Sequence, residues 1–453
     1  MAIKSQSKPT EEAMKEKANL ARAYILIALH FAGSGHSGGS LSVIDIETVL
    51  YNSILKHDPA DSFWAGRDRL FVSCQHKCPA QYAALGMAGY FPIKDFLIGL
   101  RAIGTPFQGH PDWLKLPGIE MSGGSLGQGM GVAVGSALAA KLNGESHRIY
   151  CITSDGEQQE GSVWEAYMSA AHYKLDNLCA ILDVNGLQID GKTCEVMNIE
   201  PIADKYRAFG WHVIDIDGHN IDALLAAFEE AKKIKGKPTM IVARTLKGKG
   251  VSFMEGVVDW HGKSPKLEEL KIALKELGHE ELLTEDLIKE AGAVRENIAK
   301  KYGKLIPVSE RPYWWNSQAN MKVKMSPTRA GFGASLALIG SDERIVCLGA
   351  DISSSICIYD FCKNNPERKD RFLSMGIAEQ NMTVVAAGLA KEGKIPVIGS
   401  YGVFVTGRNW DQLRTTVCYG NLNVKIAVGH GGISVGPDGA THQALEDLTL
   451  LTI

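Results

Sequence analysis

Polar residues follow two apolar runs in the first half of the chain, at the point where each run ends. Ile149 to Thr153 leads into Ser-Asp155-Gly, and Leu178 to Val184 leads into Asn185-Gly, with a helical pattern between them. This order predicts a strand, a crossover helix and a parallel strand. Ligands of such sheets bind beyond the carboxyl ends of the strands, which lie about 5 Å apart. We therefore expect Asp155, Asn185 and the Leu187 carbonyl to direct oxygen atoms toward one point.

This set of oxygen donors suits a magnesium ion. Mg²⁺ takes about six oxygen ligands and usually completes its shell with water and substrate phosphates. A helix predicted to begin near Glu157 would point its positive end at the same place. The stretch therefore predicts a site for a metal-bound diphosphate. The alternative is an ordinary strand-to-helix turn, in which Asp155 caps the helix and Asn185 shapes the turn.

Bulk properties narrow the class of protein. A chain of 453 residues exceeds one hydrophobic core and predicts about two or three domains. Its 45% hydrophobic and 22% charged residues are typical of a soluble globular protein, and its net charge of −3 does not favour a nucleic acid or an anionic membrane as partner. No apolar run approaches the ~20 residues that span a bilayer, and the N-terminus has no signal-peptide core. Nine scattered cysteines favour a reduced, cytoplasmic protein.

Several other residues have types suited to chemistry, and each also has an ordinary structural alternative. His36 lies in a glycine-rich loop, where a lone histidine is more often a structural hydrogen-bond partner. Glu379 stands at the start of an apolar helix, where an acidic side chain is favourable in any case. Tyr401 and Phe404 fall near the end of a predicted strand, Ile395 to Phe404, and are consistent with a hydrophobic core.

Two more familiar kinds of site are disfavoured by spacing. Cys74, His76 and Cys78 fit no common zinc pattern. The glycine-rich segment 120–135 contains no Gly-x-Gly-x-x-Gly and follows no predicted strand, so a dinucleotide site is weakly supported. Its Gly127, Gly131 and Gly135 recur every four residues, which predicts a helix face without side chains that would allow close packing.

The motifs together resemble those of the transketolase family. Asp155-Gly, Glu160-Gly and Asn185-Gly-Leu-Gln-Ile-Asp-Gly resemble its thiamine diphosphate motif, with Ser154 in place of the usual first glycine. Gly376-Ile-Ala-Glu379-Gln-Asn-Met resembles its Gly-x-x-Glu-x-x-Met, with Gln380 in place of the usual histidine. Histidine motifs occur in family order along nearly the whole chain, at His36, His76, His110, His261, His430 and His442.

The resemblance implies a set of site residues. The metal, Mg²⁺ or as substitutes Ca²⁺ or Mn²⁺, would be held by Asp155, Asn185 and the Leu187 carbonyl. The cofactor thiamine diphosphate would contact His76, Gly124, Leu126, Gly156, Glu160, Asn185, Asp351, Tyr401 and Phe404. Glu379 would hold a proton on the pyrimidine nitrogen, and the other catalytic residues would be His36, His110, His261 and His442. The substrate would be bound by Arg329, Ser355, His430 and Asp438.

The implied fold is α/β, with two open, mostly parallel sheets flanked by helices. Residues 1–263 would form a diphosphate- and metal-binding domain, residues 264–325 a helical connector with an irregular Arg311 to Asn316 segment, and residues 326–453 a pyrimidine-binding domain. The family's last strands of this second domain, and its third domain, have no counterpart, so we expect the pyrimidine domain to be incomplete. The cofactor would lie between subunits of a homodimer.

The implied activity is transfer of a two-carbon ketol unit from a ketose phosphate to an aldose phosphate, as in the pentose phosphate pathway. Two alternatives remain. One is another thiamine diphosphate enzyme, such as a deoxyxylulose-phosphate synthase, although His261 and the segment from Asp438 to His442 favour a transketolase. The other is a cofactor-binding module without activity.

Overall fold

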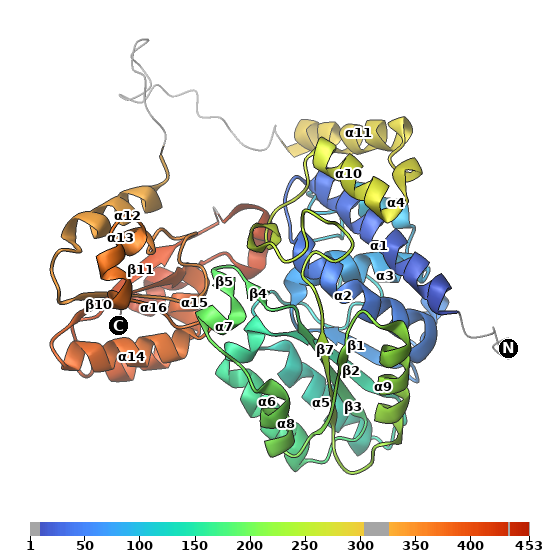
Figure 1. Cartoon of the computed structure of the whole chain (residues 1–453), viewed down its shortest axis with the longest axis horizontal. Helices are drawn as coiled ribbons and strands as arrows, with labels where there is room; N and C mark the ends of the chain where they lie inside the picture. Colours follow the sequence, from blue (N-terminus) through green and yellow to red (C-terminus); the bar gives the residue numbers. More distant parts are fainter. Residues whose placement is uncertain (1–9, 303–325, 434, 453) are drawn as a thin grey trace, which may run out of the picture.

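The computed structural model describes residues 10–302, 326–433 and 435–452. These residues form two α/β units that lie side by side (Figure 1). The irregular segment predicted at 311–316 and part of the predicted connector fall outside the described residues. No helix in the described ranges is long and apolar enough to cross a membrane.

The first unit is built on a five-stranded sheet in which every neighbouring pair is parallel. The prediction of a strand, a crossover helix and a parallel strand is confirmed, because β2 and β3 are adjacent and pair Ile149 with Leu178. Alternate strand residues face two separate cores, which explains why the strands read as continuous apolar runs. The strands, in sheet order, are β1 (Arg69–Val72), β2 (Ile149–Ser154), β3 (Leu178–Val184), β7 (Thr239–Arg244) and β6 (His212–Asp217).

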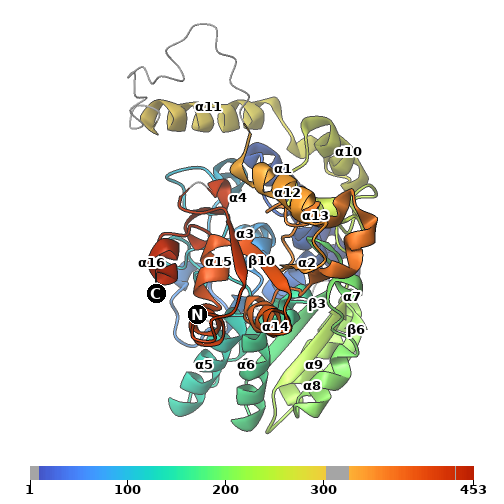
Figure 2. The ribbon, with the colours of Figure 1, turned by 90° about the vertical axis from the view of Figure 1, so that its left-hand side faces the viewer.

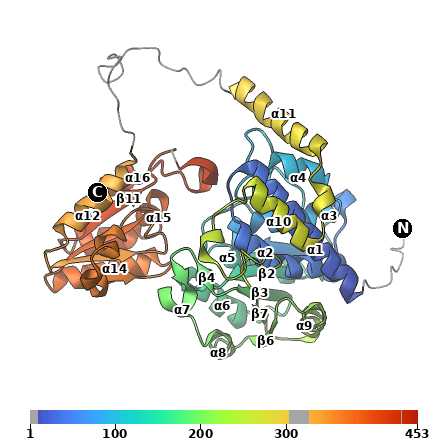
Figure 3. The same ribbon diagram turned by 45° about the horizontal axis from the view of Figure 1, so that its top comes forward.

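Helices cover both faces of this sheet. Three of them form the core on one face: α5 (Gly129–Leu142), α6 (Gly161–His172) and α8 (Ile202–Ala208). The opposite core is formed by α1 (Glu11–Ala32), α2 (Ser37–Val49), α3 (Cys78–Met87), α4 (Ile93–Gly99), α9 (Ile221–Lys233) and α10 (Leu267–Leu277). Helix α11 (Glu285–Tyr302) packs on α4, so the helical part of the predicted connector lies against the first unit (Figure 3).

Local capping explains how the first helices aim their loop. Thr10 caps α1 by accepting a hydrogen bond from the Ala13 amide. Gly33 ends the helix in the left-handed conformation, with φ 68°, which glycine adopts without steric cost. The chain then reverses and places His36 directly before α2.

The second unit has a four-stranded parallel sheet in the order β11, β10, β8, β9. Its strands are β8 (Ile345–Gly349), β9 (Phe372–Ser374), β10 (Ile395–Tyr401) and β11 (Lys425–Gly429). Its helices are α12 (Thr328–Ile339), α13 (Asp360–Lys363), α14 (Glu379–Lys391), α15 (Gly402–Gly407) and α16 (Asp447–Leu451). Both units therefore have the predicted α/β architecture with parallel sheets.

Two element predictions are wrong in detail. The strand predicted from Ile395 to Phe404 ends at Tyr401, where the chain turns into α15, so Phe404 lies on a helix. Gly127 does not share a helix face with Gly131 and Gly135, because it has a φ of 89° and precedes the start of α5 at Gly129.

The two units meet through loops at the carboxyl ends of their sheets. A hairpin of β4 (Leu187–Gln188) and β5 (Gly191–Lys192), followed by α7 (Thr193–Val196), reaches toward the second unit (Figure 1). Figure 2 shows the molecule with the second unit in front of the first. At its tip, Asp190 accepts a hydrogen bond from the Ser353 amide at 3.1 Å, while Asp351 accepts one from the Asp190 amide at 3.1 Å. This reciprocal pair of carboxylate–amide bonds fixes the hairpin against the loop that follows β8.

Candidate active site between the two units

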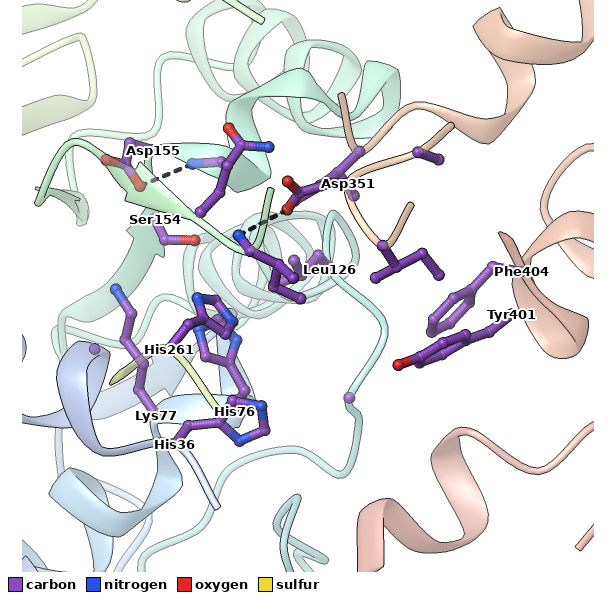
Figure 4. A pocket seen from close by; sticks show the side chains of 18 of the residues that line it. His36, His76, Lys77, Leu126, Ser154, Asp155, His261, Asp351, Tyr401 and Phe404 are labelled. Atoms are coloured by element: carbon purple, nitrogen blue, oxygen red, sulfur yellow. Dashed lines mark hydrogen bonds between the residues drawn. The ribbon is translucent and has the colours of Figure 1, made fainter. Parts of the chain in front are cut away.

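A pocket at the junction of the two units collects most of the predicted site residues. Those that line it are His36, His76, His110, Gly124, Leu126, Asp155, Gly156, Asn185, Leu187, His261, Asp351, Glu379, Tyr401, Phe404, Asp438 and His442. The predicted residues Glu160, Arg329, Ser355 and His430 do not line it. Figure 4 shows the histidines and Lys77 on one side and Tyr401 and Phe404 across from them.

Asp155 and Asn185 of the predicted metal corner directly follow β2 and β3 and line the pocket. Asp155 is buried, accepts a hydrogen bond from the Gly156 amide at 2.8 Å, and accepts another from the Gly186 amide at 2.6 Å. Asp155 is thus a helix cap and also a tie between the two strand ends. The Asn185 side-chain oxygen accepts from the Leu187 amide at 3.2 Å, as a turn residue does. Asp155 therefore caps a helix and Asn185 shapes a turn, and both residues also line the pocket.

The donor chemistry of this corner fits a cation. The Leu187 carbonyl accepts a hydrogen bond from the Lys247 ammonium group at 3.1 Å, so it already faces a positive charge. Burial raises the pKa of Asp155, and Lys77 opposes that rise. Within the described ranges, no group of three or more His, Cys, Asp or Glu residues is arranged to hold a metal. The predicted set uses one carboxylate, one amide oxygen and one carbonyl, as magnesium sites that rely on phosphate ligands do.

A buried ion pair supports the metal corner from behind. Asp183 is fully buried and lies 2.5 Å from the Lys77 ammonium group. It also accepts hydrogen bonds from the hydroxyls of Ser42 and Thr245, and from the Asn185 amide nitrogen at 3.4 Å. Burial alone would raise the pKa of Asp183, but Lys77 and the hydroxyl donors hold it below its ordinary value. The Asn185 side chain is thereby oriented with its oxygen away from Asp183.

Five histidines form a continuous cluster along the pocket. The rings of His36, His76 and His261 lie 5.3 to 5.5 Å apart, and His110 stacks on His442 at 4.7 Å. Burial, followed by the neighbouring histidines, lowers the pKa of His36 and His76 well below the ordinary value, and burial lowers the pKa of His110 to about 3. At neutral pH each ring therefore has one nitrogen that donates and one that accepts a hydrogen bond.

The second unit contributes a buried acidic centre. Glu379 is the first residue of α14, is 2% exposed, and accepts hydrogen bonds from the Ser400 hydroxyl at 3.0 Å and from Arg408 at 3.1 Å. Arg408 also binds Glu160, the Ser125 hydroxyl at 2.6 Å and the Leu126 carbonyl at 2.9 Å, all in the first unit. Burial raises the pKa of Glu160 to about 8.

The remaining predicted residues lie at the outer end of the pocket. The Ser355 and Tyr401 hydroxyls lie 3.0 Å apart, and the Tyr401 and His430 ring centres are separated by 4.1 Å. Asp438 lies 3.5 Å from the guanidinium group of Arg101. Asp351 follows β8 of the same unit, and burial and the nearby Asp190 raise its pKa to about 7.

Lys247 and Arg408 are among the pocket residues that the sequence reasoning missed. Lys247 follows the carboxyl end of β7, the same kind of position that identified Asp155 and Asn185, so that rule would have found it. Arg408 follows α15 and has no comparable local signal, since its partners Glu160 and Leu126 lie 248 and 282 residues away in the sequence.

Parallel sheets whose carboxyl ends meet at one pocket define an α/β protein with a ligand site shared by two domains. Residues 13–332 match the family described as "Transketolase, thiamine diphosphate binding domain", and residues 325–453 match "Transketolase, pyrimidine binding domain". The chain belongs to the transketolase family.

Individual relatives support this assignment. Human transketolase-like protein 2 is 35% identical over 97% of this chain and 68% of its own length, and human transketolase is 34% identical over 99% and 70%. The 6-deoxy-6-sulfo-D-fructose transketolase subunit SqwG of Clostridium sp. (strain MSTE9) is 46% identical over 59% of this chain and 97% of its own length. The crystal structure of transketolase from Campylobacter jejuni aligns with a TM-score of 0.59 and 29% identity over 97% of this chain and 73% of that one.

Proposed function

We propose that this protein transfers a two-carbon ketol unit from a ketose to an aldose, each with an anionic group at its far end. The observation that carries the proposal is the convergence of Asp155 and Asn185 from the first unit with Glu379 from the second around one pocket. When bound, thiamine diphosphate supplies a nucleophilic carbon able to break and form the carbon–carbon bond beside a ketose carbonyl.

The metal corner provides the binding of the diphosphate end. Asp155, Asn185 and the Leu187 carbonyl would hold Mg²⁺, with phosphate oxygens and water completing its shell. Lys247 would then redirect its ammonium group from the Leu187 carbonyl toward the anionic groups. His76, Gly124, Leu126 and Gly156 line the neighbouring wall.

The acidic centre provides the positioning of a proton at the pyrimidine end. Glu379 is buried and directed by Ser400 and Arg408, so it would hold a proton in a hydrogen bond to a ring nitrogen. Tyr401 and Phe404, whose ring centres lie 6.3 Å apart, would enclose the ring.

The neutral histidines provide proton transfer to sugar oxygens. A neutral imidazole accepts a proton through one nitrogen and donates through the other, which suits it to both halves of a reversible transfer. His36 and His261 face each other from the first unit, with ring centres 5.5 Å apart, and His110 and His442 form the next pair outward. Asp438 would bind a sugar hydroxyl.

A second copy of the chain is the proposed partner. On α5, Gly131 and Gly135 are exposed, no heavy atom lies within 4 Å of the position of an added Cβ, and the neighbouring Val132 is 44% exposed. Such a face allows close approach of another helix. In this structure one chain supplies both walls of the pocket, so a site shared between subunits stays a prediction.

A second candidate concerns the sugar itself. The relative SqwG acts, by its name, on 6-deoxy-6-sulfo-D-fructose, and its 46% identity exceeds that of the human transketolases. A sulfosugar ketose is therefore a candidate donor beside a ketose phosphate.

A coupled assay tests the proposal directly. With thiamine diphosphate and Mg²⁺ present, we expect turnover of xylulose 5-phosphate with ribose 5-phosphate, or of 6-deoxy-6-sulfo-fructose with an aldose phosphate. Calorimetric titration with thiamine diphosphate is the companion measurement. Binding without turnover of any ketose would identify a binding module, and absence of binding at millimolar Mg²⁺ would remove the basis of the proposal.

A further inference from the structure

Two pocket histidines are each held by a positively charged side chain. The Nδ1 atom of His261 lies 2.7 Å from the ammonium group of Lys247. The Nδ1 atom of His36 lies 3.5 Å from the guanidinium group of Arg101. Ammonium and guanidinium groups donate hydrogen bonds and cannot accept them, so both ring nitrogens are the acceptors. Lys247 has three donors, and it can keep its bond to the ring while another moves from the Leu187 carbonyl toward anionic groups.

A third histidine is held in the opposite way. The Nδ1 atom of His110 lies 3.3 Å from the backbone carbonyl of Asp438, which belongs to the second unit. A carbonyl only accepts hydrogen bonds, so this nitrogen carries a proton. His442 is not fixed in this way, because its Nδ1 atom lies 2.8 Å from the Thr441 hydroxyl, which can either donate or accept.

The remaining nitrogen of each ring then has the opposite role. Burial lowers the pKa of His36, His110 and His261 below the ordinary value, so each ring is neutral at pH 7 and carries one proton. Burial also lowers the pKa of Lys247, to about 8, and the ammonium form predominates at pH 7. Nε2 is therefore protonated in His36 and His261, which we call the donor pair, and unprotonated in His110. All three rings line the pocket, and within the described residues their Nε2 atoms have no hydrogen-bond partner.

Tight packing holds the two cations against the rings. Lys247 is 1% exposed, and a Cβ atom at Gly38 would come within 2.9 Å of its Cγ atom. The side chain of Arg101 is 5% exposed, and a Cβ atom at Gly109 would come within 2.7 Å of its Nε atom. Both glycines thus provide the space that these long side chains occupy beside the histidines.

We propose that Lys247 and Arg101 are positioning residues, which keep the donor pair as hydrogen-bond donors toward the pocket and leave His110 as the opposed acceptor. The donor pair then suits a carbonyl oxygen or an alkoxide of the sugar, and His110 suits a sugar hydroxyl. This consequence rests on the proposed ketol transfer, since it specifies how the sugar is oriented. The ring tautomers themselves can be measured without turnover.

The first test is a spectrum of the unmodified protein. Its histidine rings are labelled with ¹⁵N, and long-range ¹H–¹⁵N correlation spectra are recorded at pH 7 without cofactor. The couplings of each nitrogen to the carbon-bound ring protons show which nitrogen is protonated, and replacing each histidine with glutamine identifies its signals. We expect the proton on Nε2 in His36 and His261, and on Nδ1 in His110. The same tautomer in all three rings, or a mixture in the donor pair, would overturn the proposal.

Substitution of Arg101 tests its part in the arrangement. In Arg101→Met we expect the His36 ring to exchange between both tautomers, so that its two nitrogen shifts move toward their mean. Arg101→Lys keeps a donor-only cation and should keep the proton on Nε2. Arg295→Met is the control, because Arg295 donates to the Leu100 carbonyl at 2.9 Å, beside Arg101 in the chain, and does not line the pocket. An unchanged His36 tautomer in Arg101→Met would contradict the role of this residue.

Lys247 provides the same comparison at a second ring. Lys247→Met should release the His261 tautomer and Lys247→Arg should retain it, so the test does not depend on the folding of one variant. An unchanged His261 tautomer in Lys247→Met would contradict the role of Lys247.

Turnover adds a kinetic readout. At saturating thiamine diphosphate, Arg101→Met should lower kcat/KM for a ketose at least about tenfold, with partial recovery in Arg101→Lys. A loss of turnover with an unchanged His36 tautomer would show that Arg101 acts only through Asp438, which overturns the proposal. The expected tautomers in a protein that binds the cofactor and turns over no ketose would contradict ketol transfer and leave the hydrogen-bond assignment intact.

Discussion

Arg408 makes three hydrogen bonds from the second unit to the first, and its removal gives the most quantitative prediction. Its guanidinium group binds the carboxylates of Glu379 and Glu160, and also the Ser125 hydroxyl and the Leu126 carbonyl. Replacing Arg408 with alanine would leave the buried carboxyl groups of Glu379 and Glu160 without their shared cation. Removing one partner of a buried ion pair costs about 3–5 kcal/mol, because the other charge stays desolvated.

The lower end of this range fixes the expected effect. Because the pKa of Glu160 is raised to about 8, this carboxyl group already holds a proton at pH 7 and only one charge of the pair is stranded. We therefore take about 3 kcal/mol, which corresponds to about a hundredfold change in an equilibrium constant. We expect Arg408→Ala to lower the free energy of unfolding by that amount in urea. We expect its affinity for thiamine diphosphate, measured by calorimetry, to fall about a hundredfold, since the ring wall and Glu379 lose their tie to the first unit.

Arg414, six residues further along the chain, provides a matched control. Arg414 is exposed and rests over the Trp410 ring at 5.5 Å, so Arg414→Ala should change stability by less than about 1 kcal/mol. Adding Glu160→Gln to Arg408→Ala removes one stranded carboxyl group and should restore part of the loss. If Arg408→Ala binds the cofactor within twofold of the unmodified protein and keeps its free energy of unfolding, this residue is not a link between the units.

Three further substitutions test separate parts of the structure. Glu379→Ala should bind thiamine diphosphate within a few fold of the unmodified protein yet lose at least about a hundredfold in turnover, and near-normal turnover would remove its proposed role. Asp155→Ala should abolish the dependence of cofactor binding on Mg²⁺, measured by titration with and without the metal; retained dependence would place the metal elsewhere. Glu47, in α2, is fully buried, and neither carboxylate oxygen has a partner in the described structure. Burial raises its pKa from 4.5 to about 8, so the folded protein binds the proton more tightly and loses stability as pH rises through that interval, by about 3 kcal/mol at pH 7. Glu47→Leu should therefore be the more stable form above pH 5 in urea unfolding, by a margin that grows toward pH 8; a margin independent of pH would contradict the titration.

The sequence predicted those parts of the site that follow from local pattern. Asp155 and Asn185 could be placed together because parallel strands put the residues after their carboxyl ends at one edge of the sheet. The same logic fails where a strand ends early, and Phe404 was therefore assigned to β10 and not to α15. In a continuous apolar run, the sequence pattern does not show where the strand ends and a helix begins.

Contacts between distant segments were not predictable in this way. The bond of Lys247 to Leu187 joins segments 60 residues apart within the first unit. Three of the four bonds of Arg408 cross from the second unit to the first, and no spacing in the chain encodes that arrangement. The family resemblance supplied most of the site because it carries information on such docking. It named neither of these two residues, which reach the pocket through long side chains.

Many of the hydrogen bonds between the two units involve a main-chain amide or carbonyl on one side. Asp190 and Asp351 each accept a hydrogen bond from an amide of the opposite unit. Gln159 accepts one from the Ile377 amide at 2.8 Å, and Arg408 donates one to the Leu126 carbonyl. These bonds use backbone amides and carbonyls, which are the same in every copy of the chain. An identical second unit from a neighbouring molecule would offer the same groups to the same partners.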